Sequence, residues 1–484
     1  MRVVFLQPFF QNEPYQNSMP PLGVGYLSSY AKERCWFVET FFAQTPQDAI
    51  DLTPDLVGLS SATENFNDAI KTAEAIKKTL NIPIVIGGIH ITSLPHTLPD
   101  CFDVGVIGEG EETFTEVAKI FNENVPSIDD LLKIRGICFH KDGEVIITQP
   151  REFFKSLDAL SYPDRKILGE KWAIPFHKQV HMITSRGCPY NCTFCASSLH
   201  WGRFRTFSAK YVVDEIEFLI EKYEPLEVYF FDDLFIGHLP RFKEICNLLE
   251  ERGLHKNVIF RSYARVDLLN ENFADTFANM NFRYIDFGFE SNSEKVLKFY
   301  NKSNVTPEKN QRAIDLLFER GISIGANFLL GAPIETYEEM QCSLDFCIKN
   351  KDKLDRLSVG PVLPLPGTPL WFQAIKDGIV SESMDWSAFH LDLNNLDLDK
   401  IPYLCKNVSK EKFMEIQNQF NQLAKEINQA GYIRKLNSEL ARREAEVFQL
   451  KSEVATIKGS SLFKIAWKLR NLFHKTGKIN KSKK

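Results

Sequence analysis

The sequence predicts an α/β protein in three parts: a doubly wound parallel sheet, a partial barrel of six strand–helix units, and a helical C-terminal tail. Short apolar runs alternate with helical patterns up to about residue 400. Glycine or small polar residues follow several runs, as expected where parallel strands turn into helices. Near residue 440 the charge changes sign, which marks a separate segment. The predicted parts are a first domain at 1–150, a linker at 151–174, a second domain at 175–400, a helical extension at 401–458 and a basic tail at 459–484.

Length and composition exclude several classes of protein. Of the 484 residues, 44% are hydrophobic and 25% are charged, which is the balance of an ordinary folded protein. The net charge of −5 gives no reason to expect a nucleic-acid partner. The N-terminal apolar run is too short for a signal peptide, and no run approaches the ~18–20 residues of a membrane-spanning helix. We therefore expect a cytoplasmic protein whose 10 cysteines are thiols or metal ligands.

The first domain is predicted to be a Rossmann-like sheet. Its predicted strands are 3–6, 56–61, 82–86 and 104–107, and its predicted helices are 22–31 and 69–80. Ligands of such sheets bind at the carboxyl ends of the strands. Small residues follow three of these strands, where they either let a ligand approach the backbone or simply form tight turns. These residues are Ser60, Ser61, Gly87, Gly88, Gly108 and Gly110.

Three cysteines in the second domain give the strongest chemical signal. Cys188, Cys192 and Cys195 lie within eight residues, on a loop that leaves a predicted strand. Thiolates gathered on one loop select iron–sulfur clusters, zinc or copper(I). A cluster normally takes four cysteines, and the next one is Cys246, so one iron would keep an open coordination position. The alternatives are a zinc site with a distant fourth ligand, or cysteines that only pack.

The remainder of the second domain is predicted to be a series of consecutive strand–helix units. Its predicted strands are 180–183, 227–231, 258–261, 284–289, 323–330 and 357–363. Thr306 with Pro307 predicts one helix start, and Thr336 with Glu339 forms a capping box for another. Six units are fewer than the eight of a closed barrel, so we expect an open (β/α)6 barrel of the TIM type.

Charged residues follow several of these predicted strands. They are Asp232, Asp233, Arg265 and Glu290. Charges beside core strands are costly unless they are paired or solvated. As a set at one rim they favour a polar cofactor or substrate, and the alternative is that acids and arginines pair with one another.

On these motifs the chain resembles the radical S-adenosylmethionine (SAM) enzymes that carry an N-terminal cobalamin-binding domain. The resemblance covers about residues 1–400, and its most specific part is the cysteine spacing with Phe194 before the last cysteine. It implies a [4Fe–4S] cluster held by Cys188, Cys192 and Cys195, whose open iron chelates SAM. It also implies a 5′-deoxyadenosyl radical, a small-molecule substrate, and a reduced flavodoxin- or ferredoxin-type electron donor.

The resemblance assigns roles to the polar rim of the second domain. Asp232 or Asp233 would contact the methionine amino group, and Glu290 would contact the nucleoside. Phe194 would contact the adenine through its backbone, and Arg265 is grouped with these cofactor-binding residues.

The turns of the first domain resemble those of a cobalamin-binding domain. The implied cobalamin contacts are Ser60, Ser61, Gly87, Gly88, His90, Gly108, Glu109 and Gly110. The D-x-H-x-x-G loop that places a histidine on cobalt is absent, so cobalamin is expected to bind without a lower histidine ligand. A domain that keeps the fold but has lost the cofactor is the alternative. A lone histidine in a turn, such as His90, is more often structural than a ligand.

The C-terminal part carries different information. From Ala441 to Lys484 there are 12 Lys and Arg against 3 Asp and Glu. A helix is predicted over 413–432, and apolar residues at 433–457 follow heptad spacing, which indicates a coiled-coil homo-oligomer or a helix packed on its own domain. Residues 462–473 are basic and amphipathic, which suits peripheral contact with the inner face of a membrane or a solvated tail, and the last ten residues are predicted to be disordered.

The favoured function is a cobalamin-dependent radical SAM methyltransferase that acts on a small metabolite or a sugar-type substrate. The sugar-type substrate rests on a loose resemblance of the tail to bacterial cell-surface glycan assembly proteins. The alternative enzyme is a radical mutase, dehydrogenase or cyclase in which cobalamin is non-methylating or absent. A third hypothesis is a non-enzymatic assembly or membrane-adaptor protein.

Overall fold

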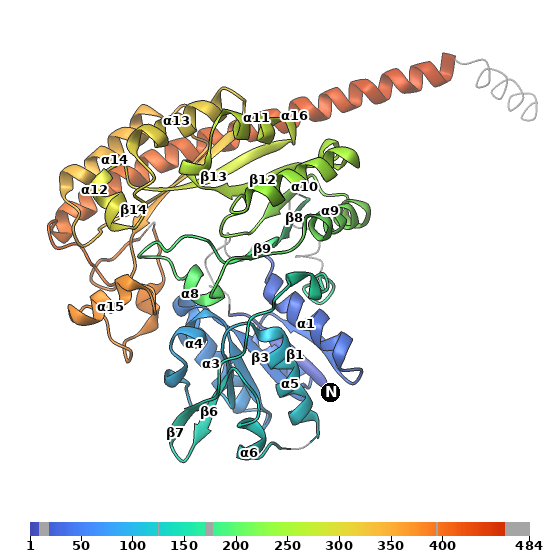
Figure 1. Ribbon diagram of the computed structural model, residues 1–484, viewed down its shortest axis with the longest axis vertical. Coiled ribbons are helices and arrows are strands. Elements are labelled where there is room, and N and C mark those ends of the chain that lie inside the picture. The colour runs from blue at the N-terminus through green and yellow to red at the C-terminus, as the bar shows by residue number, and fades with distance from the viewer. Residues whose placement is uncertain (9–18, 124, 170–177, 394, 460–484) are drawn as a thin grey trace, which may run out of the picture. The chain divides into compact units, whose positions relative to one another are not determined.

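The computed structural model describes residues 1–8, 19–123, 125–169, 178–393 and 395–459. The chain divides into two compact units, residues 1–425 and 426–484. The first unit contains both predicted sheets (Figure 1). The α/β fold class is therefore confirmed.

The first sheet has seven strands in the order β2-β1-β3-β4-β5-β6-β7. The five strands from β2 to β5 are parallel, in the order of doubly wound folds, and β6 and β7 form an antiparallel hairpin at the edge. The strands are β1 (Arg2–Leu6), β2 (Glu39–Ala43), β3 (Leu56–Ser60), β4 (Ile84–Gly87), β5 (Val104–Val106), β6 (Ile137–Lys141) and β7 (Glu144–Ile147).

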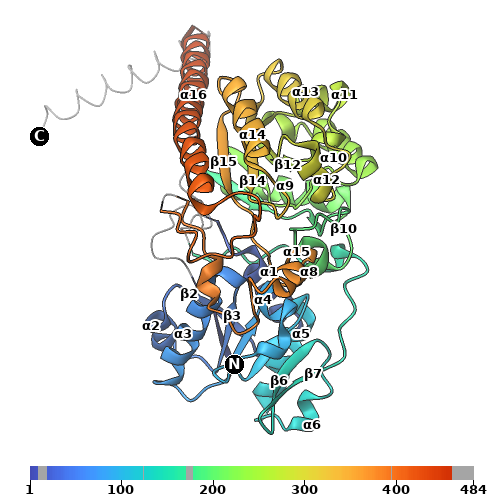
Figure 2. The same ribbon diagram turned by 90° about the vertical axis from the view of Figure 1, so that its left-hand side faces the viewer.

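Helices cover both faces of this sheet because alternate residues of each strand point to opposite sides. Val3 and Phe5 belong to the core under α1 and α5, whereas Val4 and Leu6 belong to the core under α2, α3 and α4. Figure 2 shows α2 and α3 on the side away from α5. The helices are α1 (Leu22–Arg34), α2 (Pro46–Asp51), α3 (Phe66–Lys77), α4 (Ile89–Ser93), α5 (Gly110–Glu123) and α6 (Ile128–Leu131).

The expectation of a wholly parallel first sheet was wrong at one edge, where β6 and β7 are antiparallel. The β6–β7 hairpin turns at Asp142 and Gly143, which both adopt left-handed φ angles of 52° and 86°. Asp-Gly is a strong signal for a two-residue hairpin turn, and the sequence interpretation overlooked it. The edge strand β2 was also overlooked, because its five residues are only partly buried and carry no clear alternation.

The second sheet has six parallel strands in the order β15-β14-β13-β12-β11-β8. Each of the six predicted apolar runs corresponds to one strand, so the partial barrel is confirmed. β8 and β15 are the two edges of the described sheet, which is therefore open. The strands are β8 (Gln179–Met182), β11 (Glu227–Phe230), β12 (Ile259–Ala264), β13 (Phe282–Glu290), β14 (Ser323–Leu330) and β15 (Arg356–Pro361).

Helices follow the strands of the second sheet, and α9 to α14 pack on its outer face, whereas α8 and α15 lie toward the first sheet (Figure 1). Thr306 caps α13, and Thr336 with Glu339 forms the predicted capping box of α14. The helices are α8 (Ser197–Trp201), α9 (Ala209–Tyr223), α10 (Leu239–Glu251), α11 (Glu271–Asn279), α12 (Glu294–Phe299), α13 (Pro307–Phe318), α14 (Tyr337–Lys349) and α15 (Pro369–Lys376).

A single helix, α16 (Lys410–Gly459), joins the two units. Its first turns pack in the first unit, where Phe413, Ile416 and Phe420 are buried. From residue 433 onward its described heptad residues are exposed, namely Ile433, Leu436, Leu440, Val447, Leu450 and Val454. The predicted homo-oligomer and membrane contact stay predictions, and the basic segment at 460–484 lies outside the described residues.

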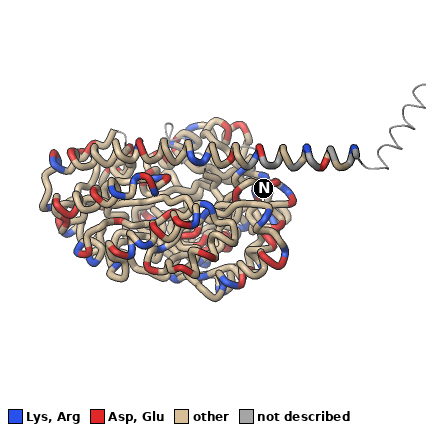
Figure 3. The backbone as a smooth tube through the Cα atoms, turned by 90° about the horizontal axis from the view of Figure 1, so that it is seen from above, with Lys and Arg blue, Asp and Glu red and all other residues tan. Residues whose placement is uncertain are grey.

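Charge is mixed along the chain rather than segregated in the described part. Acidic and basic residues are interspersed along the backbone tube (Figure 3). Among the helices that the structure describes, none is long and apolar enough to cross a membrane.

Candidate functional site

The three motif cysteines lie on one loop with a two-stranded ribbon at its base. β9 (Ser185–Arg186) leads into the loop, β10 (Arg205–Thr206) leaves it, and the two strands pair antiparallel. Cys188, Cys192 and Cys195 are half-buried free thiols. The ribbon thus fixes both ends of the segment that carries all three sulfur atoms.

Backbone hydrogen bonds anchor the middle of this cysteine loop to the second sheet's helices. The N–H of Thr193 donates to the carbonyl of Tyr300 at 3.2 Å, and the Thr193 carbonyl accepts from the N–H of Leu370 at 3.2 Å. The side-chain amide of Asn301 donates to the carbonyl of Asn191 at 2.8 Å. These contacts fix the middle of the loop against residues that follow α12 and against α15.

The motif thiols must be deprotonated before they can bind a metal. Within the described ranges, no group of three or more His, Cys, Asp or Glu side chains is arranged to hold a metal ion. Burial raises the pKa of Cys188 to about 11 and that of Cys195 to about 12, so iron binding must release their protons.

The two predicted aspartates after β11 lie in different surroundings. The buried Asp232 carboxylate accepts hydrogen bonds from the N–H and hydroxyl of Thr184, both at 3.0 Å, and from the hydroxyl of Ser185. Burial raises its pKa to about 6. Asp232 therefore holds the chain that enters the cysteine loop. Asp233 accepts a hydrogen bond from Ser197, and its charge acts on the thiols of two motif cysteines.

Arg265 lies beside the cysteine loop. Its guanidinium donates to the sulfur of Cys192 at 3.7 Å and lies over the ring of Tyr190 at 3.7 Å. Its Nε also donates to Asp267 at 2.7 Å. Arg265 is thus paired, and it also reaches a predicted cluster ligand.

Glu290 and Phe194 are both committed to contacts within the chain. Glu290 adopts a left-handed φ of 62° at the end of β13, and its carboxylate accepts from the ammonium of Lys302 at 2.8 Å. Such a backbone conformation is strained for a residue with a side chain and is common at functional sites. The ring of Phe194 packs edge-on against Tyr300 with centroids 5.0 Å apart.

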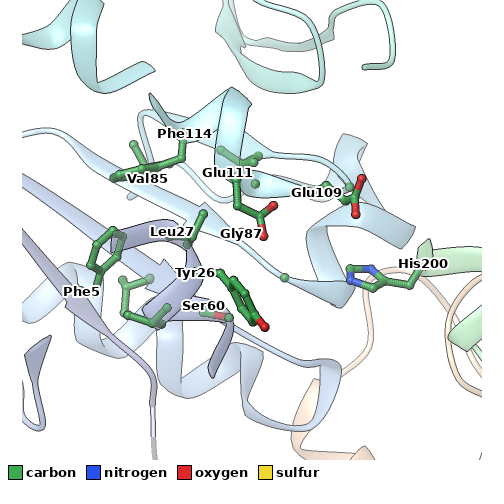
Figure 4. Close-up of a pocket in the computed structure, with 18 of the residues that line it drawn as sticks. Phe5, Tyr26, Leu27, Ser60, Val85, Gly87, Glu109, Glu111, Phe114 and His200 are labelled. Atoms are coloured by element: carbon green, nitrogen blue, oxygen red, sulfur yellow. The ribbon is translucent and has the colours of Figure 1, made fainter. Parts of the chain in front are cut away.

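A cavity of about 150 Å³ lies at the carboxyl ends of the first sheet's parallel strands (Figure 4). Helices α1 and α5 form one wall. Residues flanking the cysteine loop form another, namely Ile183, Arg186, His200 and Trp201. The predicted residues that line the cavity are Ser60, Gly87, Gly88, Gly108, Glu109 and Gly110.

Two predicted cobalamin contacts, Ser61 and His90, do not line this cavity. The Ser61 hydroxyl donates to the side chain of Asn65 at 2.9 Å. His90 is fully buried, stacks on Phe66 and meets the edge of Trp386. Burial lowers the pKa of His90 to about 3, so it is a neutral core residue.

The glycines of these turns have two different causes. At Gly88, with φ 110°, a Cβ atom would lie 2.3 Å from the Ser61 carbonyl oxygen, so the tight turn itself requires glycine. Gly108 also has a left-handed φ of 78°, but a Cβ there would meet nothing within 4 Å. Gly108 therefore borders open space in the cavity.

Two side chains that line the cavity each carry a buried polar atom without a partner (Figure 4). The hydroxyl of Tyr26 and the Nδ1 of His200 have no hydrogen-bond partner among the described residues. Burial, reinforced by the charge of Arg186, lowers the pKa of His200 to about 4, so the imidazole is neutral. Unpaired buried polar groups are costly, and a bound cofactor can satisfy them.

Sequence reasoning missed the arginines that join the cavity to the cysteine loop. Arg186 and Arg205 pair with Glu109 across the cavity wall, and Arg186 also pairs with Glu111. Burial alone would raise the pKa of Glu109, but the two arginines outweigh it and lower that pKa. The partners are 75 or more residues apart in sequence, so no local pattern could have revealed them.

Comparison with known proteins identifies the family. The radical SAM superfamily model matches residues 182–347, and the B12 binding domain model matches residues 13–118. An uncharacterized methyltransferase of Pyrococcus horikoshii is 30% identical over 386 residues, covering 76% of this chain and 81% of that protein. This chain belongs to the cobalamin-binding radical SAM family.

Other members of this family differ in their reactions. The anaerobic magnesium-protoporphyrin IX monomethyl ester cyclase of Rubrivivax gelatinosus is 31% identical over 362 residues, covering 70% of this chain and 64% of that protein. Among solved structures, the radical SAM methyltransferase TsrM of Kitasatospora setae matches with a TM-score of 0.67 and 18% identity, over 87% of this chain and 89% of that one. At that identity the match with TsrM supports the fold alone.

Family membership confirms two predictions from the sequence. The protein is a radical SAM enzyme, and it carries an N-terminal B12-binding domain. These domains imply a [4Fe–4S] cluster, SAM and cobalamin as cofactors. The domain boundaries, the roles of individual residues and the partners stay predictions.

Proposed function

We propose that this enzyme is a cobalamin-dependent methyltransferase that acts on a carbon atom of a small metabolite or a sugar-type substrate. One observation carries the proposal: Arg186, His200 and Trp201 flank the cysteine loop and also line the cavity of the first sheet. The candidate sites of both cofactors therefore adjoin within one compact unit. A methyl group and a radical can then be delivered to the same substrate.

Different residues of the chain would hold different parts of the cofactors. When bound, the cluster and SAM supply a 5′-deoxyadenosyl radical, and methylcobalamin supplies the methyl group. Asp233, beside the thiols, is the residue we assign to the SAM amino group, and Asp232 positions the loop. Glu290, held by Lys302, would contact the nucleoside, and the backbone of Phe194 would contact the adenine.

Named relatives support methyl transfer and keep one alternative open. A cytidylyl-2-hydroxyethylphosphonate methyltransferase of Streptomyces wedmorensis is 25% identical, over 74% of this chain and 78% of that protein. The Rubrivivax cyclase favours the alternative, in which the radical drives cyclisation, rearrangement or dehydrogenation without methyl transfer.

Two further expectations concern the electron donor and the lower ligand of cobalt. We expect a flavodoxin- or ferredoxin-type electron donor. We also expect cobalamin to bind without a lower histidine ligand from the first domain, since His90 is packed in the core away from the cavity.

Product analysis tests methyl transfer without knowledge of the substrate. The chain, purified without oxygen and loaded with iron, is incubated with SAM and a low-potential reductant, with and without cobalamin. Methyl transfer from SAM to bound reduced cobalamin releases S-adenosylhomocysteine, whereas abortive radical formation releases 5′-deoxyadenosine. We expect both products with cobalamin, and only 5′-deoxyadenosine without it.

The same experiment separates the two candidate reactions. 5′-Deoxyadenosine without S-adenosylhomocysteine, even with bound cobalamin, would reject the methyltransferase and favour the alternative. A Cys188→Ala variant is the control, because it should form no 5′-deoxyadenosine.

A further inference from the structure

Four buried charged residues form one cluster between the first sheet and the cysteine loop. Nη1 of Arg186 lies 2.6 Å from Glu109, and its Nη2 pairs with Glu111. Nη1 of Arg205 lies 2.9 Å from the other oxygen of Glu109. All four side chains are at most 6% exposed, so solvent does not screen these pairs.

Each pair in this cluster joins the two candidate cofactor sites. Glu109 and Glu111 lie at the start of α5, and both line the cavity. Arg186 and Arg205 are cross-strand partners in the β9–β10 ribbon at the base of the cysteine loop. Cys188 follows Arg186 by two residues.

Arg186 contacts the cavity directly as well. Its guanidinium lies 5.6 Å from the ring of Tyr26 and 5.1 Å from the ring of Trp201, and both rings line the cavity. A ligand that moves these rings or the two glutamates must therefore act on Arg186. A buried ion pair that loses its geometry leaves uncompensated charge, so the cluster favours one joint arrangement of cavity wall and loop.

We propose that Arg186 is a positioning residue that couples the two cofactor sites through Glu109 and Glu111. Cobalamin, bound with one end group in the cavity of about 150 Å³, and the [4Fe–4S] cluster on the cysteine loop then stabilise each other's binding. This inference rests on the proposed function, because it requires that the cavity takes part of cobalamin. Coupling between two binding sites is reciprocal and is typically about 5–150-fold in affinity.

The test is a comparison of cobalamin affinities with and without the cluster. The dissociation constant for hydroxocobalamin is measured by equilibrium dialysis with cobalt analysis. It is measured for the iron-loaded full chain and for a variant with all three motif cysteines changed to alanine. The ratio of the two dissociation constants measures the coupling. A loss of affinity that affects the iron-loaded chain and the cysteine-free chain equally cancels in this ratio.

Glu111→Gln is the informative variant, and Glu116→Gln is its matched control. Both residues lie on α5 and pair with an arginine, but Glu116 pairs with Arg151 and does not line the cavity. We expect the cluster to tighten cobalamin binding about tenfold in the wild type and in Glu116→Gln. In Glu111→Gln we expect the ratio to fall to about one, with binding retained in both forms.

A second variant keeps the test decisive if Glu111→Gln folds poorly. Arg186→Lys preserves the charge, but a lysine ammonium cannot donate to both glutamates as the planar guanidinium does. The ratio of the two dissociation constants should therefore also fall to about one in this variant. The inference would be overturned if either folded variant kept a tenfold ratio of dissociation constants. It would also be overturned if this ratio were one in the wild type. Failure of every form to bind cobalamin would instead reject the proposed function, and the inference with it.

Discussion

The two carboxylates that follow β11 illustrate how neighbouring residues take different tasks. Asp232 is fully buried and receives its hydrogen bonds from the chain entering the cysteine loop. Asp233 receives one from Ser197 and acts on the cysteine thiols. Both residues follow the end of β11, and their hydrogen bonds show that their side chains lie in different surroundings. The sequence could not decide between the two, because both occupy the same strand end.

Exchanging each aspartate for asparagine should separate these tasks. Asp232→Asn should lower the free energy of unfolding by about 1–3 kcal/mol, because an amide cannot accept all the hydrogen bonds that the carboxylate accepts. Asp233→Asn should leave stability nearly unchanged and weaken SAM binding about tenfold, because the charge on its acceptor is lost. Urea unfolding and SAM binding are the two measurements. If Asp233→Asn destabilised the fold and Asp232→Asn weakened SAM binding instead, the two roles would have to be exchanged.

His90 predicts how stability depends on pH. Its pKa is lowered to about 3 in the folded chain by burial, whereas in the unfolded chain it is about 6.5. Below about pH 6.5 the unfolded chain therefore binds a proton that the folded chain does not. Stability is fully present above that pH and should fall by about 2 kcal/mol from this residue between pH 7.5 and about pH 5.

Urea unfolding at both pH values checks this expectation. His90→Gln should reduce the loss of stability on acidification, whatever its own effect at neutral pH. His96→Gln is the control, because His96 is exposed beside Glu382. An unchanged pH dependence in His90→Gln would argue against a neutral buried imidazole.

At the scale of elements, glycines in the strand–helix turns of the first sheet have two different roles. Gly88 is required for the fold of its turn, whereas Gly108 borders the cavity. Gly88→Ala should cost about 2–5 kcal/mol of stability, because the left-handed backbone is strained and the new methyl meets the Ser61 carbonyl. Gly108→Ala should cost only about 1–2 kcal/mol, since its Cβ would meet nothing. Its methyl would instead enter the cavity and weaken cobalamin binding. Thermal unfolding and cobalamin titration distinguish the two, and full cobalamin affinity in Gly108→Ala would contradict the assignment of this cavity.

The elements that could be predicted are those whose burial is visible in the local pattern of apolar and polar residues. The six strands of the second sheet are buried by helices and read as apolar runs. The predicted helix at 413–432 and the heptads at 433–457 form one helix, because nothing in the sequence between them stops it. β2 and β7 carry weaker apolar patterns because they are edge strands, whereas the β6–β7 hairpin could have been predicted from its Asp-Gly turn.

The candidate site was predictable only where a motif lies within one short segment. The cysteine loop and the glycine turns are such segments. The cavity wall is not, because Arg186, His200 and Trp201 reach residues of the first sheet across a long stretch of chain. Their partners are set by the packing of two sheets, which no local spacing encodes.

At the scale of the whole molecule, one compact unit contains the candidate sites of both cofactors. The matched B12-binding domain carries the cavity, and the matched radical SAM domain carries the cysteine loop, whose flanking residues line that cavity. The exposed heptads after residue 433 belong to the second unit and to a separate prediction of self-association.

Metal analysis of the chain, purified without oxygen after growth with cobalamin, is the most direct test for the two cofactor sites in one unit. We predict about four irons and about one cobalt per chain, with iron lost and cobalt retained when the three motif cysteines are replaced by alanine. Iron without cobalt, even after incubation with cobalamin, would mean that the first domain keeps only the fold. Zinc in place of iron would contradict the account of the cysteine loop.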